Sequence, residues 1–173
     1  MQFIFLPQWL TILLCFIVWP TLQIAIALVF NHLSDSEILS FSNCLRTRTW
    51  EDHGKFYKRF FKINLWQKLL PDGAAVLESG FRKKSLQKIS VPYLDKFIVE
   101  TYRAELIHIF AIFPFWIFGF WSPPIVILYM LLYALAVNFP CILLQRYNRP
   151  RLVRLRDRLL KKKVTIFKIM RLF

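Results

Sequence analysis

The sequence predicts an all-α membrane protein with three transmembrane helices, a helical hairpin and amphipathic interfacial helices on the cytoplasmic face. Three observations lead to this fold class. The 173 residues are 57% hydrophobic and 17% aromatic, which is more than a soluble domain of this size can bury. Three long stretches carry almost no charge. All 24 Lys and Arg residues lie in the two segments that follow the first and the third of these stretches.

The first apolar stretch, residues 8–30, contains 23 residues and no charged side chain. At about 1.5 Å per residue it is long enough for a helix that spans a membrane. Pro20 can kink such a helix, and membrane helices tolerate this. We expect the helix to be retained and not cleaved as a signal peptide, because no Lys or Arg precedes it and its apolar run is too long.

The segment 31–103 is polar and carries 13 Lys and Arg against eight Asp and Glu. Within it, residues 55–66 have the pattern of an amphipathic helix, with basic residues on one face and apolar residues on another. These residues are Lys55, Lys58, Arg59 and Lys62, and Phe56, Phe60 and Ile63. Such a helix is expected to lie in the lipid headgroup layer. Residues 70–73, Leu-Pro-Asp-Gly, predict a turn.

A further helix is predicted to begin near Pro92, because proline is favoured in the first helical turn, and to continue into the second span, residues 104–121. Residues 121–124, Trp-Ser-Pro-Pro, predict a tight turn, and residues 125–144 form the third apolar span. The last two spans therefore make a hairpin with almost no outer loop. The whole chain, residues 1–173, is expected to be one membrane-embedded domain.

The distribution of charge predicts the orientation. Thirteen Lys and Arg lie in residues 31–103 and eleven in the tail, residues 145–173. Three crossings place both segments on one side, which the positive-inside rule assigns to the cytoplasm. We expect a multi-pass protein of the plasma membrane with an outer N-terminus, an inner C-terminus and a cytoplasmic active face. The tail helix, with Leu152, Leu155 and Leu159 on one stripe, is expected to lie on the anionic lipids of the inner leaflet.

Several function classes find no support in the sequence. Zinc-finger spacings and aromatic RNA-binding strands are missing, so the net charge of +14 does not indicate nucleic acid. The cysteines Cys15, Cys44 and Cys141 do not cluster, so we expect no disulfide framework and no cysteine-based metal site. The sequence has no G-x-S-x-G, P-loop or G-x-G-x-x-G motif, and no His followed five residues later by Asp. We expect no bound cofactor.

Glu105 and His108, at the membrane entrance of the second span, are the first candidates for chemistry. Residues three apart share a helix face, and ionisable groups inside a membrane are expensive and usually functional. Glu105 could fix the imidazole tautomer while His108 takes a proton from a hydroxyl. Two alternatives stay open. Glu105 could snorkel while His108 is hydrogen-bonded inside the bundle, or the Glu-x-x-His spacing could bind a metal, although a second copy is missing.

Polar residues of the third span could bind substrate. Asn138 lies two turns before Gln145, and Arg149 continues the same stripe. Asn138 could hydrogen-bond the histidine of the second span or a substrate carbonyl, or it could simply join two helices. The guanidinium groups of Arg146, Arg149 and Arg151 could clamp a phosphate or carboxylate, or they could serve only to set the topology.

His53 is a second candidate base. It follows Glu51 and Asp52 and precedes Gly54, a setting that suits an acid or base. The alternative is a solvated loop residue.

Three blocks of sequence resemble a known family. They are residues 53–57, His-Gly-Lys-Phe-Tyr, with Trp66 and residues 70–73; residues 100–108, Glu-Thr-Tyr-Arg-Ala-Glu-Leu-Ile-His; and residues 138–140, Asn-Phe-Pro, with residues 145–152, Gln-Arg-Tyr-Asn-Arg-Pro-Arg-Leu. Together they resemble the glycosyl-4,4'-diaponeurosporenoate acyltransferases, which complete staphyloxanthin-type carotenoids, over about residues 43–152. One departure is Ile109, where Trp is expected after the histidine; this difference is expected to alter acceptor fit and not chemistry.

The resemblance implies an acyltransferase. Its donor would be a fatty acyl thioester of coenzyme A or acyl carrier protein, and its acceptor a sugar hydroxyl of a glycosyl carotenoid or similar glycolipid. The matched blocks imply Glu100 and Asn148 as further substrate-binding residues. Arg103 or Arg146, with Asn138, would stabilise the oxyanion.

The alternative function is a non-catalytic membrane scaffold for lipid or carotenoid enzymes, whose basic faces bind anionic lipids or a partner. The polar set inside the spans favours a catalyst, because a scaffold has little need for it. In either case a homo-oligomer could complete a lipid-facing groove.

Overall fold

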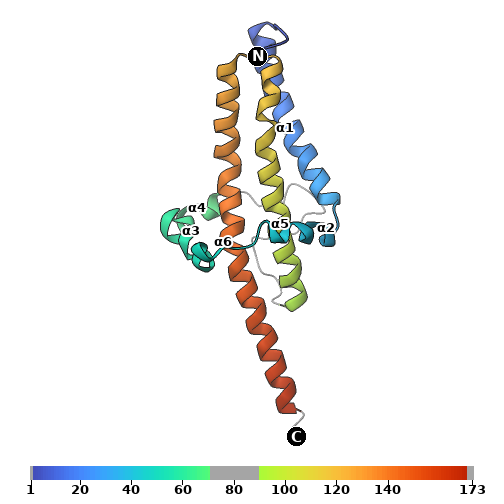
Figure 1. Cartoon of the computed structure of the whole chain (residues 1–173), viewed down its shortest axis with the longest axis vertical. Helices are drawn as coiled ribbons and strands as arrows, with labels where there is room; N and C mark the ends of the chain where they lie inside the picture. Colours follow the sequence, from blue (N-terminus) through green and yellow to red (C-terminus); the bar gives the residue numbers. More distant parts are fainter. Residues whose placement is uncertain (1, 71–89, 171–173) are drawn as a thin grey trace. The chain divides into compact units, whose positions relative to one another are not determined.

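The structure, a computed structural model, describes residues 2–70 and 90–170, with side chains in the last helix described up to residue 162. Throughout this part the elements are helical, and three are long and apolar enough to cross a membrane. They are α1 (Gln8–His32), α5 (Val91–Ile112) with its continuation η5 (Phe113–Phe120), and α6 (Pro124–Met170) (Figure 1). The predicted all-α class with three apolar spans is confirmed.

Shorter helices occupy the described residues between α1 and α5. They are α2 (Asp35–Ser40), η1 (Phe41–Asn43), η2 (Thr49–Gly54), α3 (Lys55–Phe60), α4 (Ile63–Trp66) and η3 (Gln67–Leu69). The turn predicted at residues 70–73 falls outside the described residues except for its first position. The chain divides into two compact units. The first unit comprises residues 1–37 and 103–142, and the second unit residues 38–102 and 143–173.

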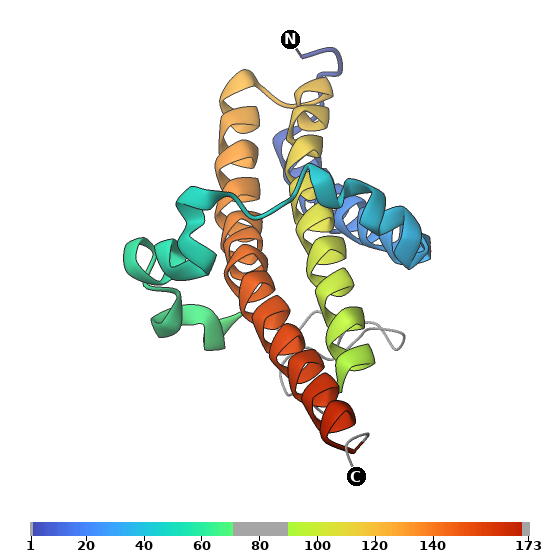
Figure 2. The ribbon, with the colours of Figure 1, turned by 60° about the horizontal axis from the view of Figure 1, so that its bottom comes forward.

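In the first unit, α1 lies beside the second half of α5 (Figures 1 and 2). It also contacts the first half of α6, where the ring centroids of Trp19 and Tyr133 are 5.5 Å apart. Trp19, Phe118 and Ala134 form its buried core, and the rings of Trp19 and Phe118 are 5.9 Å apart. A polar contact also joins α1 to α5: Gln23 Nε2 donates to the backbone oxygen of Ala111 at 2.9 Å. Close packing of a large ring against a small residue, with a side-chain amide as a tie, is typical of helices in a bilayer.

Outside this core, most of the surface of α1 is apolar. Of the 25 residues of α1, only Trp19 and Phe30 are buried, and Phe16 is 76% exposed. Water-soluble proteins rarely expose an apolar surface of this size. Lipid tails would cover it, so the surface agrees with the apolar length of the helix in indicating a membrane span.

The second span changes from an α-helix to a 3-10 helix at η5. Pro114 explains the change, because proline lacks the N–H donor and its ring clashes with the carbonyl four residues earlier. The predicted turn then follows, and α6 begins at Pro124. The N-terminal segment covers this end of the hairpin: the backbone N–H groups of Phe3 and Ile4 donate to the Phe120 oxygen at 3.0 and 2.9 Å.

In the second unit, the first half of α5 packs along the second half of α6. The buried residues of this contact are Leu94, Phe97, Ile98 and Leu152. Leu155 and Leu159 pack against the same cluster. The leucine stripe of the tail therefore has a protein neighbour, whereas the sequence led us to expect it on the inner leaflet. The sequence pattern shows that such a stripe will be buried, and it does not distinguish helix from lipid as the cover.

A second cluster joins α3 and α4 to α6 through Tyr57, Ile63, Leu143 and Tyr147. The single amphipathic helix predicted over residues 55–66 is wrong: the chain forms two short helices that meet at Lys62, whose φ is 49°. The indole N–H of Trp66 donates to the Phe61 oxygen at 2.8 Å. This bond replaces the backbone bond that a continuous helix would make at that oxygen.

The third span and the basic tail form one helix. α6 runs without interruption through Pro140 and Pro150 to Met170, so the boundary predicted between residues 144 and 145 is not a break in structure. Neighbouring side chains can satisfy the backbone oxygens that an interior proline leaves without a donor. The tail is thus a direct extension of a membrane helix.

The two units differ in charge. Among the side chains that the structure describes, the first unit carries one Lys or Arg, Arg103, against three Asp and Glu. The described side chains of the second unit comprise 16 Lys and Arg against five Asp and Glu, which leaves +11. The positive-inside rule therefore applies mainly to the second unit, which carries nearly all of the described Lys and Arg residues.

Candidate active site

His108 and Asn138 meet inside the first unit. The distance from His108 Nδ1 to Asn138 Oδ1 is 2.9 Å. His108 is half-buried on α5, and Asn138 is 1% exposed on α6. Of the two partners that the sequence left open for Asn138, the structure selects the histidine of the second span. The contact joins two apolar helices by polar side chains, which are expensive at membrane depth.

The hydrogen bonds around Asn138 determine the imidazole tautomer. Asn138 Nδ2 donates to the backbone oxygen of Ala134 at 3.0 Å, which fixes the orientation of the amide. The oxygen Oδ1 then faces His108, and an amide oxygen can only accept. Nδ1 of His108 must therefore carry a proton, and in the neutral ring Nε2 carries the lone pair. Asn138 thus holds His108 in the tautomer whose Nε2 is unprotonated, which is the form that a general base requires.

Glu105 precedes His108 by three residues on the same helix, and its side chain is completely buried. Residues at this spacing lie on one face of α5. A buried carboxylate and an imidazole on one face of an apolar helix are rare in membrane spans, because ionisable groups there are costly. Asn138 makes a short contact with the ring nitrogen Nδ1 of His108. From the sequence we expected Glu105 to orient the imidazole, and a hydrogen bond between Asn138 and His108 was one of the options considered.

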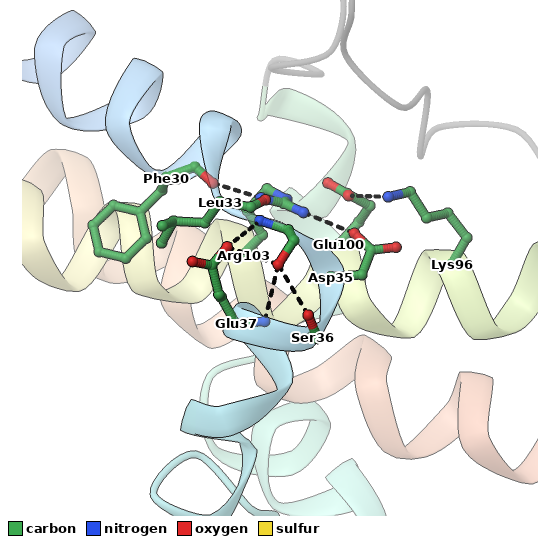
Figure 3. Close-up of polar contacts among 9 residues, drawn as sticks. Phe30, Leu33, Asp35, Ser36, Glu37, Lys96, Glu100 and Arg103 are labelled. Atoms are coloured by element: carbon green, nitrogen blue, oxygen red, sulfur yellow. Dashed lines mark hydrogen bonds and ion pairs between the residues drawn. The ribbon is translucent and has the colours of Figure 1, made fainter.

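Arg103, expected to bind substrate, ties two helices together in the first unit (Figure 3). Its Nη1 donates to the backbone oxygens of Phe30 and Leu33, and Nη2 pairs with Asp35 at 2.9 Å. The last carbonyls of a helix lack intrahelical donors, and a cation there also complements the helix dipole. Arg103 is 5% exposed. Its guanidinium is therefore engaged at the end of α1.

The segment after α1 is ordered by local contacts (Figure 3). The hydroxyl and backbone N–H of Ser34 both donate to the carboxylate of Glu37, at 2.7 and 2.6 Å. These two donors hold the pKa of Glu37 below its usual range. In the second unit, the predicted substrate residue Glu100 lies 3.4 Å from the ammonium group of Lys96 on the same helix.

A separate polar cluster lies in the second unit around Glu51, which is 1% exposed. Its Oε1 accepts from Arg146 Nη1 at 2.9 Å and from the backbone N–H of Arg48 at 3.1 Å. Burial and the nearby charge of Glu51 raise the pKa of Tyr57 to about 12. The sequence argument considered Glu51 only as a neighbour of His53 and did not consider Tyr57, because nothing in the sequence shows that α6 returns to this point.

Arg149, another expected substrate residue, is fully engaged by the protein. Its Nε and Nη2 donate to the hydroxyl and the backbone oxygen of Thr101 at 3.0 and 3.1 Å, and Nη1 donates to Leu45 O at 2.9 Å. The guanidinium also lies 3.7 Å from the ring centroid of Tyr102. The other two arginines of the expected clamp have separate partners. Arg146 is bonded to Glu51, and the guanidinium of Arg151 lies over the ring of Tyr147. The contact with this ring uses the face of the Arg151 guanidinium and none of its N–H donors.

Three expected site residues remain in the second unit. Gln145 is buried and Asn148 is half-buried, both on α6. His53 is exposed and lies in a left-handed turn, with φ 54°. Among the described residues, no group of three or more His, Cys, Asp and Glu could hold a metal ion.

Comparison with known proteins assigns the chain to a family. Residues 42–158 match the family model described as glycosyl-4,4'-diaponeurosporenoate acyltransferase. The chain belongs to this family. A glycosyl-4,4'-diaponeurosporenoate acyltransferase of Staphylococcus aureus strain Newman is 34% identical over 153 residues, which cover 88% of this chain and 92% of the relative. The protein of that name from strain COL is 33% identical over 145 residues, which cover 84% and 87%. No solved structure matches.

The family assignment confirms the resemblance that the three sequence blocks indicated. The matched range includes His53, His108 and Asn138. All three therefore lie in the part of the chain that defines this acyltransferase family. The first transmembrane helix, α1, precedes the matched range.

Proposed function

We propose that this protein moves a fatty acyl group from an acyl thioester to a sugar hydroxyl of a glycosylated carotenoid or a similar glycolipid. The observation that carries the proposal is the contact of His108 with Asn138, in a chain that belongs to an acyltransferase family. The names of the relatives supply the class of acceptor. The fixed tautomer supplies the base that an acyl transfer to a hydroxyl needs.

The reaction assigns each group one task. His108 Nε2 takes the proton of the sugar hydroxyl while the hydroxyl oxygen attacks the thioester carbonyl carbon. The tetrahedral intermediate then collapses, the carbon–sulfur bond breaks, and the departing thiolate receives the proton from the imidazolium. An ester and a free thiol result, and His108 returns to its starting state. Asn138 holds the ring through Nδ1 in both protonation states, since that nitrogen is a donor in each.

The apolar surface of the first unit supports a lipid-soluble acceptor. Both a fatty acyl chain and a carotenoid carry long apolar portions, and burial against protein or lipid stabilises them by about 25 cal/mol per Å². A base at the side of membrane helices meets such a substrate without removing it from the bilayer. The largely exposed apolar face of α1 and the aromatic η5 segment provide suitable contact surface.

The charge of the second unit supports a plasma-membrane orientation with this unit in the cytoplasm. Its excess of 11 positive charges among described side chains is the strongest topogenic signal of the chain. The N-terminus would then lie outside and the C-terminus inside. Acyl thioesters are made in the cytoplasm, so the same orientation gives the protein access to its donor.

The test uses cells that make the glycosyl carotenoid and lack its acyltransferase. Expression of the wild-type chain should convert the glycosyl carotenoid to a product heavier by one acyl group, measured by mass spectrometry. His108→Ala should form this product at least about 100-fold more slowly while reaching the same level in the membrane. Equal product with both chains would reject His108 as the base. No product with well-folded wild type would favour the scaffold function.

A further inference from the structure

An unusual turn stands before α3 in the second unit. Asp52, His53 and Gly54 have φ angles of 42°, 54° and 91°, so three successive residues adopt the left-handed conformation. Asp and His enter this region more readily than most residues, but such backbone is strained and persists only where its surroundings impose it. Strained segments of this kind are concentrated at binding and catalytic sites.

One face of α6 holds the turn in place. Arg146, Pro150 and Arg154 follow at four-residue spacing and therefore share that face. Arg146 Nη1 bonds the carboxylate of Glu51, the residue before the turn, at 2.9 Å. Arg154 Nη2 donates to the backbone oxygen of His53 at 3.0 Å. The turn is thus fixed by side-chain bonds at its start and at its centre.

Gly54 fixes the end of the turn by close backbone approach. A Cβ atom at this position would lie 3.0 Å from the backbone oxygen of Tyr147 and 3.3 Å from the ring of Pro150. Only glycine combines the left-handed φ with this proximity at low strain. The three residues of the turn are therefore held against α6 with little freedom to move.

Stability alone does not account for the buried pair of Glu51 and Arg146. Replacing a buried ion pair by apolar residues is often neutral or stabilising, so such a pair is weak evidence for stability. Glu51 Oε2 is buried and has no hydrogen-bond partner, although buried polar atoms are normally satisfied. The pair therefore holds a strained turn without an evident gain in stability. This indicates that its role is to maintain the geometry of the turn.

The turn presents an exposed imidazole beside exposed cations. The side chain of His53 is exposed, and Arg154, which holds its carbonyl, is exposed as well. Arg151, Arg154 and Arg158 follow at spacings of three and four residues, so they share one face of α6, and all three are exposed. We call these three residues the basic stripe. The described side chains of the unit sum to +11, so this surface attracts anions.

We propose that His53 and the basic stripe bind the phosphate-bearing end of the acyl thioester donor, and that Glu51 and Arg146 position this site. The assignment rests on the proposed function for the identity of the ligand. Guanidinium and imidazolium groups form short, charge-assisted hydrogen bonds with phosphate oxygens. Coenzyme A, the prosthetic group of acyl carrier protein and lipid headgroups share this phosphate chemistry, and the test below separates them.

The test measures binding of labelled free coenzyme A to the full chain in nanodiscs of zwitterionic lipid. Because free coenzyme A carries no acyl group, the measurement does not depend on turnover. Replacing Arg151 and Arg158 together by Gln should weaken binding about tenfold or more, as expected for charge-assisted hydrogen bonds. His53→Asn should also weaken it, because Asn tolerates the left-handed backbone and removes only the imidazole. The matched control, Lys58→Gln with Arg59→Gln, removes two exposed charges from α3 and should change binding by less than about twofold.

Glu51→Gln tests the positioning role, because it keeps the shape of the side chain and removes its charge. In an acyl-transfer assay the variant should raise the KM for the donor and leave kcat and the KM for the acceptor unchanged. A purely structural role would instead lower the amount of folded protein without separating these constants. Wild-type KM in a folded Glu51→Gln protein would reject the positioning role.

Three further results decide the ligand. Binding of phosphate-bearing acyl carrier protein with the same sensitivity to the basic stripe would support a protein-borne donor at this site. Stripe-dependent binding of phosphatidylglycerol vesicles, without binding of coenzyme A or carrier protein, would overturn the donor assignment in favour of lipid. An equal loss of coenzyme A binding in the stripe and control variants would show that only the overall positive charge of the surface attracts the ligand, and would overturn the site. Stripe-dependent coenzyme A binding without acyl transfer would contradict the proposed function alone.

Discussion

The contact between Asn138 and His108 predicts a specific kinetic defect for Asn138→Leu. Leucine has the same branching and the same number of non-hydrogen atoms as asparagine, and it removes both the acceptor for His108 Nδ1 and the donor to Ala134 O. A neutral hydrogen bond contributes about 0.5–1.5 kcal/mol net. The contribution is greater where water is excluded, as at the 1% exposed Asn138. Without the bond, the ring also samples the tautomer that carries its proton on Nε2. We expect kcat to fall about 10- to 100-fold, with little change in KM.

A double-mutant cycle makes this prediction sharper. His108→Ala should lower kcat by about 100- to 10,000-fold, the usual contribution of a general base. If Asn138 acts only through the ring, adding Asn138→Leu to His108→Ala should cause no further loss. Gln23→Leu is the matched control, because it removes another side-chain amide that bonds α5 in the same unit, at Ala111 O. The assay is steady-state acyl transfer in nanodiscs. Additive losses in the cycle, or an equal loss in the control, would refute the positioning argument.

Three further predictions concern stability and pH, measured by thermal or denaturant unfolding in a mild detergent. Arg103→Met should destabilise the protein by about 2–4 kcal/mol, because it removes a charged donor from the buried carbonyls at the end of α1; an unchanged unfolding temperature would contradict this role. Gly54→Ala should destabilise it by about 1–2 kcal/mol, because the backbone is left-handed there and a Cβ meets Tyr147 O. Tyr57 has its pKa raised in the folded state to about 12 by burial and by Glu51. The folded protein therefore binds this proton more tightly than the unfolded chain, so stability should be unaffected below pH 10 and should fall between about pH 10 and 12. Tyr57→Phe should reduce that alkaline loss, and an unaltered pH profile would contradict the assignment.

The membrane spans were predictable from the sequence because hydropathy and helix length are local properties. The uncharged run before Asn31 and the run after Pro124 each exceed the length needed to cross a bilayer. The hairpin turn was predictable for the same reason, since two prolines and a serine lie between two apolar runs. No long-range contact is needed to infer any of these elements.

The break at Lys62 could not be predicted, because its cause lies outside the segment. The amphipathic pattern of residues 55–66 fits one helix as well as two. The choice between them depends on packing of Tyr57 and Ile63 against Tyr147, more than 80 residues away in the chain. The sequence also did not predict that α6 is one continuous helix, because a charged tail after an apolar span usually indicates the end of a helix.

The candidate site was predicted in part. His108 and Asn138 were identified because polar residues in apolar spans are rare, and their contact was one of two options that the stripe on α6 suggested. The arginines were harder to assign, since a sequence shows that a cation is present and not what it touches. Arg103 binds the end of α1 and Arg149 binds Thr101 and Leu45, so both hold the fold together through contacts distant in sequence.

The central claim is that this member of the family is itself an acyltransferase that uses His108 as its base. The most direct measurement is acyl transfer by the purified protein in nanodiscs, with an isotope-labelled acyl thioester and a glycosyl carotenoid. The account predicts labelled ester from the wild type and a rate at least about 100-fold lower from His108→Ala with the same unfolding temperature. Labelled ester from His108→Ala at the wild-type rate would contradict it.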